Sequence, residues 1–66
     1  MISERDIYAA AKIYIKRYGE TAATEAAMRA DEFRKKNEFE GQRVWDRIVD
    51  AINELQRIRT PEDAVN

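Results

Sequence analysis

The longest regular pattern of apolar positions in the chain runs through its C-terminal half. Apolar or small residues recur there at alternating steps of four and three: Gly41, Trp45, Ile48, Ile52 and Leu55. Such spacing is typical of a helix that buries one face. Charged and amide residues occupy the other side, and no other segment has so long an apolar face. We therefore predict a helix over residues 38–58 that supplies most of the core, with Trp45 as the central packing residue.

Residues 4–18 carry a shorter apolar stripe of the same period. Its members are Ile7, Ala11, Tyr14 and Tyr18. Ser3 is followed three residues later by Asp6, which resembles a capping box, and Gly19 suits the left-handed conformation that commonly ends a helix. This pattern predicts a helix over residues 4–18.

A third helical segment, residues 22–36, is rich in alanine, which has the highest helix propensity. Thr21 is its candidate N-cap. The inward face consists mostly of small side chains: Ala22, Ala26, Ala30 and Phe33. Because small side chains let backbones approach closely, we expect this face to lie near Gly41. Asn37 is suited to close the segment as a left-handed residue, and with Glu40 it also has the spacing of a capping box for the next helix.

These three segments predict an all-α fold, a compact three-helix bundle in one domain over residues 1–58. Residues 59–66, which contain the only proline, are expected to form a flexible C-terminal tail. A chain of 66 residues buries only about 60% of the surface that it exposes when unfolded, so its stability alone is marginal. Without cysteine it cannot form disulfides, so self-association is the remaining way to add stability unless the bundle is well packed on its own.

Composition narrows the classes of function. The chain has neither cysteine nor histidine, so it lacks the thiol nucleophile, the commonest general base and the commonest transition-metal ligands. We therefore expect no enzyme activity, no cofactor and no metal. The longest apolar run is far shorter than the roughly 20 residues of a membrane span, and no signal-peptide pattern is visible. A cytoplasmic protein without a membrane partner is the expectation.

A set of small and apolar positions carries a resemblance to a known family. An A-x-R-A-D segment and a later G-x-x-x-W-x-x-I segment leading to L-Q are formed by Ala27, Arg29, Ala30, Asp31, Gly41, Trp45, Ile48, Leu55 and Gln56. Together with the opening ISERDIYAAA, this pattern resembles a family of short bacterial proteins whose function is unknown. Its members tend to carry Gly-Asp where this chain has Asn37-Glu38, and both pairs suit a turn between helices. The resemblance implies a small all-helical protein and assigns no catalytic or ligand-binding residue.

Three large apolar residues have no place on the predicted stripes. They are Ile13, Met28 and Phe39. Phe39 has a local explanation, because it precedes the first full turn of its helix and can reach Val44 or Phe33. Scattered apolar residues are normal on protein surfaces, but such residues also mark surfaces for self-association or for a protein partner. Both interpretations stay open.

Basic residues form a strip on the first predicted helix, at Arg5, Lys12 and Lys16. A nucleic-acid footprint of this kind is usually reinforced by net positive charge, whereas 12 basic and 13 acidic residues give this chain a net charge of −1. A solvated helix face is therefore favoured. Arg29, beside the apolar stripe of the second helix, is either an anion contact or an arginine that covers the core and pairs with a carboxylate from a neighbouring helix.

Acidic residues cluster near the predicted turn between the second and third helices: Asp31, Glu32, Glu38 and Glu40. Paired carboxylates can perform acid–base chemistry or hold a hard cation. Their spacing matches no cation-binding loop, and solvated acids are ordinary at helix ends. These positions therefore do not change the expectation that no metal is bound.

These observations favour a small protein-interaction or adaptor module. A self-associating module, such as a homodimer, is the narrower form of this hypothesis. The alternative is a nucleic-acid-associated regulator that uses the basic strip. We expect a protein partner or a second copy of the chain rather than nucleic acid. Salt separates the two hypotheses, because binding to phosphates weakens steeply as salt rises.

Overall fold

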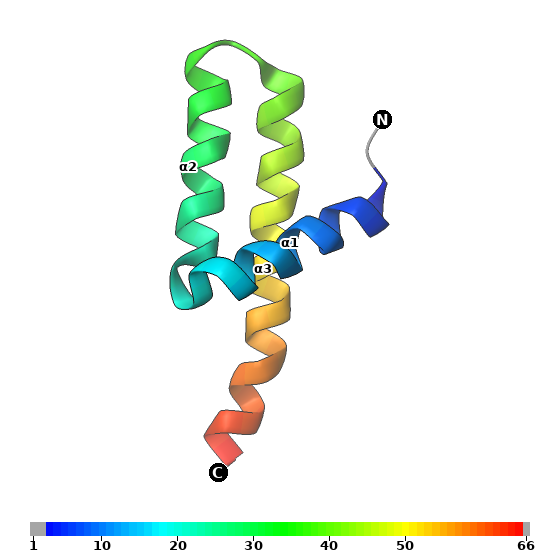
Figure 1. The fold of residues 1–66 in the computed structure, drawn as a ribbon, viewed down its shortest axis with the longest axis vertical. Coiled ribbons are helices and arrows are strands. Elements are labelled where there is room, and N and C mark those ends of the chain that lie inside the picture. The colour runs from blue at the N-terminus through cyan, green and yellow to red at the C-terminus, as the bar shows by residue number, and fades with distance from the viewer. Residues whose placement is uncertain (1–2, 66) are drawn as a thin grey trace.

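The computed structural model describes the backbone of residues 3–65 and the side chains of residues 3–57. Its elements are helix α1 (Glu4–Tyr18), a 3-10 turn η1 (Gly19–Thr21), helix α2 (Ala22–Lys35) and helix α3 (Phe39–Val65). Helices α2 and α3 form an antiparallel hairpin, and α1 crosses it steeply near the middle of α3 (Figure 1). The described residues contain no strand. The predicted all-α, three-helix fold is confirmed.

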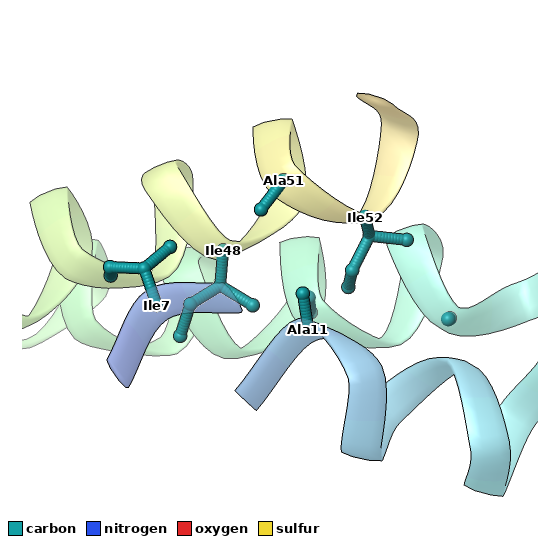
Figure 2. Close-up of a cluster of buried hydrophobic side chains, with 7 residues drawn as sticks. Ile7, Ala11, Ile48, Ala51 and Ile52 are labelled. Atoms are coloured by element: carbon teal, nitrogen blue, oxygen red, sulfur yellow. The ribbon is translucent and has the colours of Figure 1, made fainter. Parts of the chain in front are cut away.

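The core lies where α1 crosses the hairpin. Its buried cluster consists of isoleucine and alanine side chains only: Ile7, Ala11, Ala22, Ala26, Ile48, Ala51 and Ile52. Figure 2 shows Ile48 and Ile52 of α3 pointing towards α1. Ile52 is the largest side chain that is fully buried. Burial of apolar area at this crossing is the main force that holds α1 on the hairpin.

Trp45 is not the centre of the core, which corrects the prediction from sequence. It is half-buried and packs against the margin of the buried cluster. Its ring meets that of Tyr14 in an edge-on contact, with centroids 5.3 Å apart. A tryptophan is seldom fully buried because of its size, and a core built largely of alanine leaves no room for one. The periodicity identified the correct face of α3 but not the depth of each residue on it.

The turn between α2 and α3 is set by Asn37. Its φ of 61° is left-handed, as the sequence predicted. The amide of Asn37 donates to the carbonyl of Arg34 at 3.0 Å, and that of Glu38 donates to the carbonyl of Phe33 at 2.9 Å. This pair of bonds is a Schellman motif, which satisfies carbonyls at the end of α2. Of the two roles offered for Asn37, the structure therefore shows the closing one.

Gly41 approaches the inward face of α2 at Phe33, the one large residue on that face. A Cβ atom at position 41 would lie 2.8 Å from Cγ of Phe33, closer than real contacts allow. The short turn places the start of α3 beside the end of α2, where phenylalanine follows the alanines. The expectation that Gly41 closely approaches the inward face of α2 is confirmed, at the Phe33 end of that face.

The corner between α1 and α2 combines one confirmed cap with one correction. Oγ of Ser3 accepts from the amide of Asp6 at 3.3 Å, so the predicted N-cap of α1 is present. Gly19 has φ 62° and ψ −124°, a conformation that suits glycine. The hydroxyl of Thr21 donates back to the carbonyl of Tyr18 at 3.0 Å instead of capping α2. The 3-10 turn explains the difference, because it brings that carbonyl under the hydroxyl.

Helix α3 continues beyond its predicted end. The sequence placed that end at Ile58 and a flexible tail at residues 59–66, whereas the helical backbone reaches Val65. Pro61 has no amide hydrogen and cannot donate to the carbonyl four residues earlier. The helix runs on despite that missing bond, so proline did not mark the boundary. Asn66 lies outside the described residues.

Candidate interaction surfaces

The three apolar residues that fit no stripe are all exposed. Ile13 of α1 is 61% exposed, Met28 of α2 is 55% exposed and Phe39 of α3 is 60% exposed. None of them belongs to the buried cluster or to the residues packed against it. The local packing offered for Phe39 therefore does not cover its ring. In a chain whose fully buried side chains are mostly alanine, these are large apolar groups to leave in water.

The three residues lie on three different helices. Met28 follows Ala26, which faces the core, by about 200° of helix rotation, and Phe39 lies about 180° from the buried Ile48. Met28 and Phe39 therefore point away from the buried cluster, each on its own helix. Ile13 is on the crossing helix α1.

The basic strip of α1 is present as the sequence predicted. Arg5, Lys12 and Lys16 are all exposed. Within the described part of the chain, the ion pairs use Arg29, Arg34, Lys35 and Arg47, and none involves the strip. Three basic residues that form no ion pair with another described side chain therefore lie along one side of α1.

Arg29 is tied to its surroundings but is not buried. Its guanidinium lies 3.7 Å from the carboxylate of Glu32, one turn further along α2, and its side chain is 56% exposed. A hydrogen bond with Tyr14 of α1, assisted by the negative charge of Glu32, raises the pKa of Arg29. The carboxylate partner is thus on the same helix rather than a neighbouring one. The neighbouring helix α1 contributes Tyr14 to the surroundings of Arg29 and no carboxylate that pairs with it among the described residues.

The acidic residues near the hairpin turn are paired locally or solvated. Asp31 accepts from Arg34 and lies 3.3 Å from Nζ of Lys35, and the hydrogen bonds from these two cations lower the pKa of its carboxyl. Glu38 and Glu40 are exposed. Over the described residues, no group of three or more acidic, histidine or cysteine side chains is arranged to hold a metal ion.

One hollow, of about 130 Å³, lies between α1 and α3, and sequence reasoning missed it. It is lined by Glu4, Ile7, Tyr8, Arg47, Asp50, Ala51 and Glu54. The hydroxyl of Tyr8 donates to Glu54, and this hydrogen bond raises the pKa of Tyr8. Arg47 lies 3.5 Å from Glu4 at the same helix pair. Because 46 residues separate Tyr8 from Glu54, the periodicity of either helix alone gave no signal that they meet.

The comparisons with known proteins add no constraint to these surfaces. No family model, curated protein or solved structure matches the chain. The resemblance to a family of short bacterial proteins therefore stays a prediction. Among the helices of the described residues, none combines the length and the apolar character needed to cross a membrane.

Proposed function

We propose that this protein is a small interaction module that binds another protein chain through an exposed apolar side chain. The observation that supports the proposal is the exposure of Ile13, Met28 and Phe39, each by more than half of its surface. Transfer of such side chains from water to an interface contributes roughly 1.5–3 kcal/mol each when burial is complete. The partner is either a second copy of this chain or a different protein.

The separation of the three residues sharpens the proposal. Ile13, Met28 and Phe39 lie on three different helices, so a partner can bind through one of them or through several. A chain with two such faces can act as an adaptor, whereas a symmetric dimer would use one face twice. The number of faces in use therefore separates an adaptor from a dimer.

The test uses three single substitutions, Ile13→Glu, Met28→Glu and Phe39→Glu. Each position is exposed, so each variant is expected to keep its helicity and its free energy of unfolding within about 0.5 kcal/mol. Sedimentation equilibrium reports self-association, and affinity capture at high salt reports a protein partner. We expect at least one variant to lose the dimer or the captured partner. Ala27→Glu, at an exposed position beside Met28 but on another side of α2, is the matched control.

Two outcomes decide the proposal. Loss of binding in one variant, with the control unchanged, would identify the face in use. If the wild-type chain is a monomer that captures no protein, or if all three variants bind as the wild type does, the proposal is wrong. Unfolding curves for every variant separate a lost interface from a lost fold.

Nucleic-acid binding is the second candidate. It is supported by the exposed basic strip of Arg5, Lys12 and Lys16, which forms no ion pair with other described side chains. If all three residues contact phosphates of duplex DNA, log K should fall with log salt with a slope of about −2.7. Fluorescence anisotropy with labelled duplex DNA and single-stranded RNA measures this slope. A Lys12→Glu, Lys16→Glu double variant should abolish such binding, and an apolar protein interface should be unaffected by it. Absence of binding at low salt would dispose of this candidate.

A further inference from the structure

We draw no further inference here: the strongest candidate, the hollow between α1 and α3 lined by Glu4, Tyr8, Arg47, Asp50 and Glu54, is a cluster of surface carboxylates with their neighbours, and nothing in the structure shows what ligand would occupy it.

Discussion

The crossing of α1 over the hairpin and the tip of that hairpin are stabilised in different ways. At the crossing, small apolar side chains from all three helices share one buried cluster. At the tip, a single ring packs on Gly41, and the left-handed Asn37 fixes the turn through backbone hydrogen bonds. The crossing thus depends on buried apolar area, whereas the tip depends on the geometry of a few backbone positions. Substitutions at the crossing and at the tip therefore test these two sources of stability separately.

The largest effect is expected at the crossing, for Ile52→Ala. Ile52 has no exposed surface, so truncation removes its buried apolar area and leaves a cavity. The free energy of unfolding should fall by about 2–5 kcal/mol, which is a large share of the stability of a small domain. Urea denaturation followed by circular dichroism measures the loss.

Trp45→Ala is the informative comparison for Ile52→Ala, because the tryptophan is larger but only half-buried. We expect it to cost less per buried atom than Ile52→Ala. Asn53→Ala, at an exposed position of the same helix, should change the stability by less than about 0.5 kcal/mol. An Ile52→Ala variant as stable as Asn53→Ala would show that the crossing is not the core.

The next effect is expected at the corner that leads from the crossing into α2, for Gly19→Ala. No atom lies within 4 Å of a Cβ placed there, so the obstacle is the positive φ of 62° and not a steric clash. A residue with a side chain should lose about 1–2 kcal/mol in this conformation. Thermal unfolding measures the difference.

Asn37 provides the control for backbone conformation at the tip. Its φ of 61° is one that glycine adopts as readily as asparagine, so Asn37→Gly should stay within about 0.5 kcal/mol of the wild type. Equal losses for Gly19→Ala and Asn37→Gly would contradict the assignment of strain to the sign of φ.

Gly41→Ala at the tip should show a smaller net loss, of about 1 kcal/mol. Overlap of the new methyl group with Phe33 costs about 1–3 kcal/mol, and the higher helix propensity of alanine offsets roughly 1 kcal/mol of it. In a Phe33→Leu background the ring is gone, so the same substitution should become stabilising. A double-mutant cycle measures this change of sign. Additive effects would show that Phe33 does not limit the space at Gly41.

The smallest effect concerns the polar link at the crossing. The hydrogen bond from Tyr8 to Glu54, together with partial burial, raises the pKa of Tyr8 above 10.0 in the folded state. The contribution to stability is therefore fully present below the unfolded pKa near 10 and is lost as pH rises through the folded pKa. Glu54→Gln should lower the pKa of Tyr8 towards its ordinary value, as followed by NMR of labelled tyrosine rings. Glu4→Gln, which removes a weaker influence, should produce a smaller shift.

Much of the fold could be predicted from local pattern. Apolar periodicity placed α1, α2 and the start of α3 to within one residue, and glycine and asparagine marked the two positive-φ positions. Depth within the core could not be read this way, because it depends on how three helices approach one another. Trp45 therefore came out at the margin and Ile52 at the centre.

The candidate surfaces were predicted less completely. The exposure of Ile13, Met28 and Phe39 followed from their misfit to the stripes, since a helical face can be judged from one segment alone. Their positions relative to one another, and the meeting of Tyr8 with Glu54, depend on the packing of distant segments. Periodicity within a segment contains no information on such pairings.

The alanine-rich crossing also determines how stability responds to temperature. The heat capacity change of unfolding rises with the apolar area that becomes exposed and falls with the polar area. An average domain of 66 residues would show about 0.8 kcal/mol/K. Four of the seven residues in the buried cluster are alanine, so we expect a smaller value here. The stability curve should then be broad and flat, and cold denaturation should lie far below the temperature of maximum stability.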